Sequence, residues 1–154
     1  MNKDRESSVR LDCTADYEKL IPLFIRAGLE IDERKPEGLL VCTEITEPDQ
    51  GQLIGGAFLV YKNGAYLIKA LAVEDGWRGR GFGTRLVEDM LDRAAGLGAR
   101  EVYLNAKVPE FYRKLGFSAV RDGREKDLSD CVSCSRYGRD CHPQVMKKES
   151  ARTG

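Results

Sequence analysis

Short runs of apolar and β-branched residues recur along the first half of the chain and predict strands. They lie at residues 9–14, 39–46, 52–61 and 66–73. The first run alternates apolar and polar positions, as a half-buried strand does. The later runs are joined by turn-forming residues 47–51 and by Asn63-Gly64, the strongest short hairpin signal. We therefore expect an antiparallel meander, in which Gly55-Gly56 marks a bulge or a close backbone approach.

Apolar residues at helical spacing follow the first strand. Thr14 stands where an N-cap would lie for a helix that begins at Ala15, and Pro22 is expected to kink this helix. Its apolar face comprises Tyr17, Leu20, Ile21, Phe24 and Ile25. The charged residues 29–38 then indicate a loop or a short second helix.

The run at 66–73 is apolar on both faces except for Lys69, as in a central strand that helices cover on both sides. A glycine-rich turn connects it to a helix with a period near 3.6 residues, which Gly96 or Gly98 ends. The buried face of this helix is expected to comprise Leu86, Val87, Met90, Leu91, Ala94 and Ala95.

The second half of the chain alternates strands and helices. A strand at 101–106 follows the long helix, and this order favours parallel pairing with the strand at 66–73 through a right-handed crossover. Pro109 opens a short helix, residues 117–120 form a strand, and Val145-Met146 form a last, short strand.

Composition narrows the class of protein. The chain has 154 residues, which suits one domain, with a Cys-rich insertion at about 122–143. Lys plus Arg and Asp plus Glu both number 25, so net charge gives no general attraction to nucleic acid or membrane. The polar residues 1–8 lack the apolar core of a signal peptide, and no apolar run is long enough to cross a bilayer. We expect a cytoplasmic protein.

The glycine-rich turn is the first candidate for chemistry. Gly79, Gly81 and Gly83 leave backbone N–H groups uncovered where a helix starts, which favours an anion such as phosphate. Arg78 and Arg80 flank the glycines with permanent positive charges that suit phosphate oxygens. The spacing matches neither a dinucleotide-binding G-x-G-x-x-G nor a Walker G-K-[ST].

Two motifs together resemble those of the GNAT superfamily of acyl-CoA N-acyltransferases. Residues 78–83, RGRGFG, are similar to the family's pyrophosphate loop and follow a strand that ends in Leu-Ala-Val. Asn105 precedes Tyr112 by seven residues, and residues 111–117, FYRKLGF, resemble the family's second signature. The resemblance covers roughly residues 9–123. It implies an α/β fold: a mixed, mostly antiparallel central sheet of about six to seven strands with helices on both faces.

The resemblance also implies a binding site for acetyl-CoA as cosubstrate. The pantetheine arm would pair with the backbone of Leu71, Ala72 and Val73, in the opening between two parallel strands. The amides of residues 79–84, which include Phe82 and Thr84, would hold the pyrophosphate. Asn105 would hold the cofactor amide or a bound water, or would cap the next turn. No role is assigned to the acceptor region at 29–38.

By the same resemblance, Tyr112 would be the general acid, since a phenol of pKa about 10 can protonate a thiolate whose thiol has a pKa of about 8.5. A backbone N–H at Ala72 or Val73 would stabilise the oxyanion. Many relatives carry a glutamate on the strand before the glycine turn, and this chain has none there. The base could be Glu44, Glu74, a water chain or none, if the amine attacks already neutral. Lys69 could orient an acidic substrate or be a strand lysine.

The cysteine-rich segment raises a separate question. Cys131, Cys134, Cys141 and His142 are ligands of the kinds that zinc prefers. Six residues separate the two halves, which is short for a zinc ribbon, so Cys13 or Cys42 could supply the fourth ligand. Free thiols and a redox pair at Cys131 and Cys134 stay open beside zinc.

The sequence thus predicts an N-acetyltransferase that moves an acetyl group from acetyl-CoA to a primary amine of a small molecule or protein. The alternative is a CoA-binding sensor without catalysis, with the cysteine segment as its metal- or redox-responsive element. A nucleic-acid-binding zinc module is opposed by the balanced charge. The exposed sheet edges of such folds leave a homodimer open.

Overall fold

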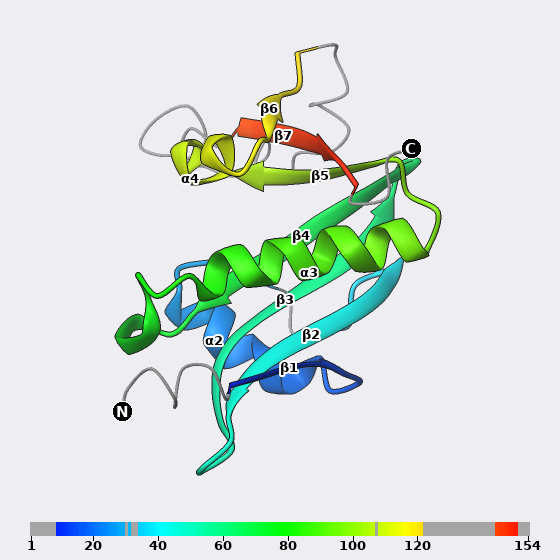
Figure 1. Cartoon of the computed structure of the whole chain (residues 1–154). Coiled ribbons are helices and arrows are strands. Elements are labelled where there is room, and N and C mark those ends of the chain that lie inside the picture. Colours follow the sequence, from blue (N-terminus) through cyan, green and yellow to red (C-terminus); the bar gives the residue numbers. More distant parts are fainter. Residues whose placement is uncertain (1–8, 30, 32–33, 107, 122–143, 151–154) are drawn as a thin grey trace.

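The computed structural model describes residues 9–29, 31, 34–106, 108–121 and 144–150. Within them, seven strands form one sheet in the order β1-β2-β3-β4-β5-β7-β6 (Figure 1). The strands are β1 (Arg10–Thr14), β2 (Leu39–Glu47), β3 (Gln52–Lys62), β4 (Ala65–Val73), β5 (Glu101–Ala106), β6 (Ser118–Ala119) and β7 (Gln144–Glu149). The helices are η1 (Glu18–Leu20), α2 (Ile21–Arg26), η2 (Asp75–Trp77), α3 (Phe82–Gly96) and α4 (Pro109–Lys114). In this part of the chain no helix has the length and apolarity to cross a membrane.

The predicted meander is confirmed, since β1 to β4 pair antiparallel in chain order. Asn63 and Gly64 join β3 to β4 with positive φ values of 50° and 80°, as a tight hairpin turn of this type requires. A Cβ at Gly56 would lie 2.8 Å from Leu20 Cδ2, so this glycine lets the segment before α2 approach the sheet closely. The close approach expected at Gly55-Gly56 is therefore present.

The first helical region differs from the prediction. Instead of one kinked helix, a 3-10 turn, η1, leads into α2, and Pro22 lies in the first turn of α2. Proline is tolerated there because the first N–H groups of a helix have no intrahelical partner. Leu20, Leu23 and Phe24 are buried, whereas Ile25 is 55% exposed and does not belong to the packed face.

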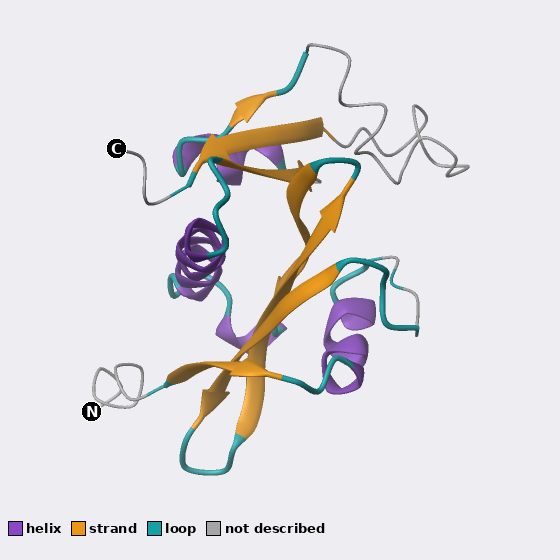
Figure 2. Cartoon of the chain, turned by 90° about the vertical axis from the view of Figure 1, so that its right-hand side faces the viewer, coloured by secondary structure: helices purple, strands orange, loops and turns teal. Residues whose placement is uncertain are grey.

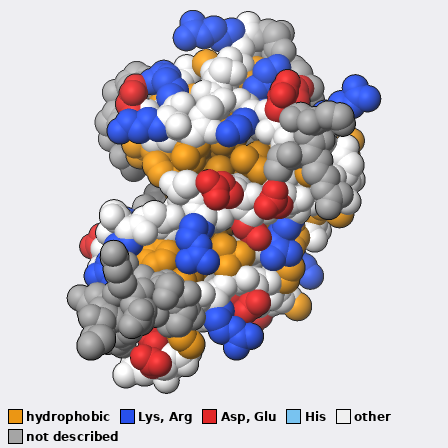
Figure 3. Space-filling view, in the orientation of Figure 1, with side chains coloured by type: hydrophobic (Ala, Val, Ile, Leu, Met, Phe, Trp, Pro, Cys, Tyr) orange, Lys and Arg blue, Asp and Glu red, His pale blue; other side chains and the backbone are white. Residues whose placement is uncertain are grey.

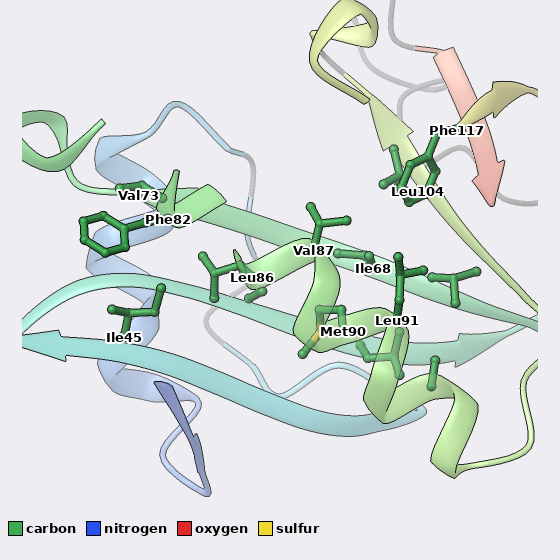
Figure 4. Packing of buried hydrophobic residues seen from close by; sticks show 14 of the residues in the cluster. Ile45, Ile68, Val73, Phe82, Leu86, Val87, Met90, Leu91, Leu104 and Phe117 are labelled. Atoms are coloured by element: carbon green, nitrogen blue, oxygen red, sulfur yellow. The ribbon is translucent and has the colours of Figure 1, made fainter. Parts of the chain in front are cut away.

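Helices cover the sheet on both faces. Figure 2 shows α3 and α2 on opposite sides of the sheet, and two separate apolar clusters match these two layers. The α3 layer includes Leu86, Val87, Met90 and Leu91, which face the sheet in Figure 4, and Phe82 at the start of the helix. Gly98 follows the C-cap residue of α3 and has φ +97°, so it ends the helix, as the sequence predicted for Gly96 or Gly98.

The C-terminal strand is longer than expected. We predicted a short strand at Val145-Met146, but β7 extends over Gln144–Glu149 and is inserted between β5 and β6. The sequence hid the length of β7 because the half-buried residues Lys147 and Lys148 interrupt the apolar pattern. Met146, fully buried, packs in the α3 layer of the core.

The sheet opens between β4 and β5. These strands pair in parallel at Tyr66↔Val102, Leu67↔Tyr103 and Ile68↔Leu104, and the pairing stops there. Lys69 is the extra residue of a bulge on β4, because Ile68 pairs with Leu59 and Ala70 with Phe58. A bulge bends and twists its strand. The parallel pairing ends at the bulge, and Figure 1 shows the two strands separating toward α4 and the start of α3.

Candidate active site

The opening of the sheet is the centre of a cleft of about 730 Å³. The lining residues come from β4, the turn before α3, the end of β5, α4 and the segment after α2. Apolar side chains gather in the hollow between α3 and the part of the molecule that contains α4 (Figure 3). Predicted site residues that line the cleft are Leu71, Ala72, Val73, Arg78, Gly79, Gly81, Phe82, Gly83, Thr84, Asn105 and Tyr112.

The end of β4 turns backbone groups toward the cleft that do not pair with a neighbouring strand. Glu74 N–H donates to the Ile54 carbonyl of β3 at 2.8 Å. Backbone groups alternate along a strand, so Ala72 also faces β3, and Leu71 and Val73 face the side on which β5 has separated. Of the two N–H groups predicted for the oxyanion, Val73 rather than Ala72 therefore points toward the opening.

The glycine turn has the conformation that its sequence predicts. Gly79 and Gly81 have φ values of +79° and +86°, which other residues rarely adopt. Gly81 is the N-cap of α3 and supplies no side-chain acceptor, so the first N–H groups of the helix stay uncovered. A Cβ at Gly79 or Gly81 would meet no atom of the described residues within 4 Å. These residues therefore leave room at the turn for an anion.

Gly83 serves packing. A Cβ at this position would lie 3.3 Å from Cζ of Phe111, so the absent side chain lets α4 approach the first turn of α3. Phe82, which is 3% exposed, belongs to the core, and its contribution to the cleft is mainly its backbone. The third glycine of the motif thus sets the distance between two walls of the cleft.

The two arginines of the turn differ in position. Arg78 lines the cleft; its Nε donates to the Val73 carbonyl at 3.1 Å, and its Nη1 lies 3.2 Å from Asp75 Oδ1. Arg80 does not line the cleft, and its guanidinium carbon lies 4.9 Å from the centroid of the Trp77 ring. Arg78 is therefore the arginine that links the end of β4 to the turn.

Tyr112 lies on α4 and lines the cleft. Its ring packs edge-on against Phe111 and Phe117, with centroid separations of 4.9 and 5.7 Å. Burial raises the pKa of the Tyr112 phenol to about 12. The hydroxyl therefore carries its proton at every physiological pH, and it is a weaker acid than the ordinary phenol that the sequence argument assumed.

The carboxylates considered as bases lie outside the lining of the cleft. Glu44 forms an ion pair with Lys19, and Glu74 forms one with Arg26. Among the described residues that line the cleft there is no Asp, Glu or His, and the ionisable side chains are Lys69, Arg78 and Tyr112. Lys69 stands at the bulge of β4, where the strands begin to separate.

The predicted zinc ligands Cys131, Cys134, Cys141 and His142 lie outside the described residues. In the part of the chain that the structure describes, no group of three or more His, Cys, Asp or Glu side chains is placed to hold a metal ion. Cys13 is exposed and Cys42 is buried, and burial raises the pKa of the Cys42 thiol.

Several lining residues have no individual role predicted from the sequence. Ala27 and Leu29 follow α2, and Trp77, Val108 and Phe111 come from the segments around α3 and α4. Of these, Leu29 belongs to the predicted acceptor region and Phe111 to the second motif. Ala27 and Leu29 belong to the α2 layer of the sheet, whereas Trp77 and Phe111 belong to the α3 layer. The cleft therefore passes through the sheet from one face to the other. Apolar side chains of this kind resemble core residues in a sequence, so only the fold reveals them.

Comparison with known proteins identifies the class. The sequence pattern of the acetyltransferase (GNAT) family matches residues 6–117. The chain belongs to this family, and it is therefore an acetyltransferase, an enzyme that uses acetyl-CoA.

Solved structures agree in fold. A Klebsiella pneumoniae protein described as a putative acyl-CoA N-acyltransferase matches with a TM-score of 0.68 at 16% identity, over 94% of this chain and 99% of that one. A Bacillus subtilis acetyltransferase in complex with CoA matches with a TM-score of 0.66 at 19% identity, over 92% and 99%. A GNAT-family acetyltransferase from Staphylococcus aureus matches with a TM-score of 0.68 at 15% identity, over 92% and 99%. The expected GNAT-like fold is thus confirmed.

Proposed function

We propose that this acetyltransferase moves the acetyl group of acetyl-CoA to a primary amine of a small molecule or protein, by direct attack on the thioester. The observation that carries the proposal is the cleft that begins where β4 and β5 separate and ends at the glycine turn. One continuous stretch of chain, residues 71–84, thus presents free backbone groups and then uncovered helix N–H groups along a single path.

The pantetheine arm would pair with the free edge of β4 at Leu71 and Val73, and the pyrophosphate would lie on the amides of the turn. Residues Gly79 to Thr84 would supply these amides, with Arg78 beside them. The thioester carbon would then lie in the opening of the sheet. Asn105, at the end of β5 on the opposite wall, would contact the arm or a water beside it.

In the transfer step, the amine nitrogen attacks the carbonyl carbon and a tetrahedral oxyanion forms. The N–H of Val73, which faces the opening, would donate to this oxyanion. As the carbon–sulfur bond breaks, the sulfur gains negative charge, and Tyr112 would donate its phenolic proton to it. The products are an N-acetyl amide and CoA. The attacking nitrogen gives up its surplus proton to water, and the Tyr112 phenolate takes a proton back from water, so the enzyme returns to its starting state.

The lining of the cleft supports attack by an amine that is already neutral. The described lining residues include no carboxylate and no imidazole that could remove a proton, and Glu44 and Glu74 are held by cations. The fraction of neutral amine would then be set by the amine itself.

The test begins with binding and turnover. Isothermal titration with acetyl-CoA should show binding, and an assay for released thiol should show turnover with at least one amine from a panel of amino acids, polyamines, aminoglycosides and peptides with free termini. Binding without turnover on any amine would contradict the transfer step and would leave a CoA-binding sensor.

The pH dependence then separates the two sources of a neutral amine. If the amine enters neutral, the rising limb of kcat/KM shifts with the pKa of the amine when two acceptors of different basicity are compared. A base on the enzyme would add a limb at one fixed pH for both acceptors. Only the first result agrees with the proposed mechanism.

Three further expectations complete the proposal. We propose that the protein acts in the cytoplasm and that it binds no nucleic acid. A homodimer is tested by light scattering of the full chain.

Zinc bound through Cys131, Cys134, Cys141 and His142 is tested by elemental analysis of protein purified without added metal. The control is the variant in which the three cysteines are replaced by serine and His142 by alanine.

A further inference from the structure

We propose that Arg26 is a positioning residue for the acetyl acceptor: its ion pair with Glu74 fixes the wall formed by Ala27 and Leu29 against the end of β4. This inference rests on the proposed function. It concerns the face of the sheet opposite the glycine turn, where α2 ends beside the cleft.

The ion pair has the geometry of a fork. Arg26 Nε donates to Glu74 Oε1 at 3.2 Å, and Nη2 donates to the other carboxylate oxygen, Oε2. Two parallel bonds fix orientation as well as distance, which a single contact does not. The hydrogen bond with Glu74 also raises the pKa of Arg26 above its usual range. The two side chains are 56% and 22% exposed, so the pair lies at the rim of the molecule.

Glu74 lies next to the backbone group that we assign to the oxyanion. It directly follows Val73, whose N–H we assign to the oxyanion, and its own N–H is fixed to the Ile54 carbonyl of β3 at 2.8 Å. Arg78 binds the Val73 carbonyl from the side of the glycine turn. Two arginines from different segments therefore hold adjacent residues at the end of β4, one on the cofactor side and one on the acceptor side.

The wall is rigidly continuous with Arg26. Ala27 is the C-cap of α2, Gly28 turns the chain with φ +83°, and Leu29 N–H donates back to the Phe24 carbonyl at 3.0 Å. Phe24 is fully buried against the sheet. Arg26 belongs to the same last turn of α2, so its ion pair would add a second restraint on Ala27 and Leu29, whose side chains line the cleft.

The chain provides a matched control. Lys19, in η1 just before α2, forms an ion pair with Glu44 of β2, and their side chains are 40% and 14% exposed. This pair ties the same helical segment to the sheet, but at the end remote in sequence from Ala27 and Leu29, which line the cleft. Arg26→Met and Lys19→Met thus remove equivalent surface ion pairs at opposite ends of the segment, and we expect similar, small changes in melting temperature for both.

The experiment uses the full chain, acetyl-CoA and the best acceptor from the amine panel. We expect Arg26→Met to raise the KM of the acceptor by roughly threefold to fivefold. This fold-change corresponds to the free energy that a part-exposed ion pair can contribute. The Kd of acetyl-CoA should change less than twofold. Lys19→Met should leave both constants unchanged, and the exchanged pair Arg26→Glu with Glu74→Arg should restore much of the acceptor KM. Arg26→Lys should restore only part, because lysine lacks the planar fork.

The outcomes separate this inference from the proposed function. If the wild-type protein turns over an amine but Arg26→Met leaves the acceptor KM unchanged, or if Lys19→Met raises it equally, the positioning role is wrong while the proposed function stands. A parallel rise in the Kd of acetyl-CoA would likewise overturn it, since the effect would then be a general distortion. Wild-type protein without turnover on any amine would overturn the proposed function, and this inference with it.

Discussion

The two walls of the cleft are built by different means. The proposed cofactor wall is a backbone surface: the free edge of β4 and the uncovered amides before α3 come from one continuous stretch, residues 71–84. The proposed acceptor wall is a side-chain surface, to which Ala27 and Leu29 contribute from the segment after α2. A cosubstrate shared by a whole family can be recognised by main-chain groups, whereas an acceptor that differs between members needs side chains that vary.

The backbone groups of the cofactor wall cannot donate a proton to the leaving sulfur, and this task is proposed for the Tyr112 hydroxyl. Its removal should have the largest effect on turnover. We expect Tyr112→Phe to lower kcat by roughly a hundredfold or more, the range for loss of a general acid. The Kd of acetyl-CoA should hardly change, because the ring still packs against Phe111 and Phe117. Steady-state kinetics and calorimetry check the two parts. Unchanged turnover across pH would remove Tyr112 from the mechanism.

Gly81 offers a test of the proposal that backbone amides of the cofactor wall bind the pyrophosphate. A β-branched residue at φ +86° is strained by about 1–3 kcal/mol, so Gly81→Val should turn the first amides of α3 away from the pyrophosphate. We expect the Kd of acetyl-CoA to rise by roughly tenfold to a hundredfold. Gly96→Ala, at a glycine of the same helix with ordinary φ and no atom within 4 Å of the added Cβ, is the control and should bind normally. Equal binding by both variants would contradict a site at this turn.

The acceptor wall depends on how closely α2 packs against the sheet. Gly56→Val would bring a side chain within 2.8 Å of Leu20 Cδ2 and 3.3 Å of the Thr43 carbonyl, as the added Cβ shows. We expect the free energy of unfolding to fall by about 1–3 kcal/mol, the usual cost of overpacking. Denaturant titration measures it, with Gly76→Ala, which meets no atom within 4 Å, as the neutral control. An unaffected Gly56→Val protein would show that this packing is looser than described.

The smallest effect is spectroscopic. Because burial raises the pKa of Tyr112 from 10.0 to about 12, the folded protein keeps this proton between those two pH values while the unfolded chain releases it. The contribution to stability is thus fully present below pH 10 and is lost as the pH rises toward 12. The alkaline difference spectrum of wild type against Tyr112→Phe should show one phenol that ionises near pH 12. Ionisation near pH 10 would mean that the phenol is in contact with water.

The sequence was sufficient for the features that depend on local pattern. Alternation, the Asn63-Gly64 turn and the 3.6-residue period of α3 predicted the meander and the long helix, and the two motifs predicted the family. Boundaries failed where tertiary packing overrides local preference: Pro22 begins a helix instead of kinking one. The length of β7 was hidden because Lys147 and Lys148 follow the apolar pair Val145-Met146 and interrupt the apolar pattern.

Other features of the site depend on residues far apart in the chain. Arg26 and Glu74 are separated by 48 positions, and no local pattern pairs them. The bulge at Lys69 follows from the pairing of β3 with β4, which periodicity does not specify to one residue. The raised pKa of Tyr112 likewise reflects burial, which the motif does not encode. Sequence therefore identified the candidate residues, and the fold decided which of them face the opening.

The short seam between β4 and β5 has a consequence for the whole sheet. Among the described residues, only the three pairs Tyr66↔Val102, Leu67↔Tyr103 and Ile68↔Leu104 join the four strands β1 to β4 to the three strands β5, β7 and β6. A pantetheine arm lying between β4 and β5 would therefore add hydrogen bonds across the sheet. We expect acetyl-CoA to slow amide hydrogen exchange in β5 and β7 as well as at the glycine turn. A fragment that ends at the diphosphate should protect the turn alone, and equal protection by both ligands would contradict this idea. The two parts of the sheet would then be joined along their full length only while acetyl-CoA is bound.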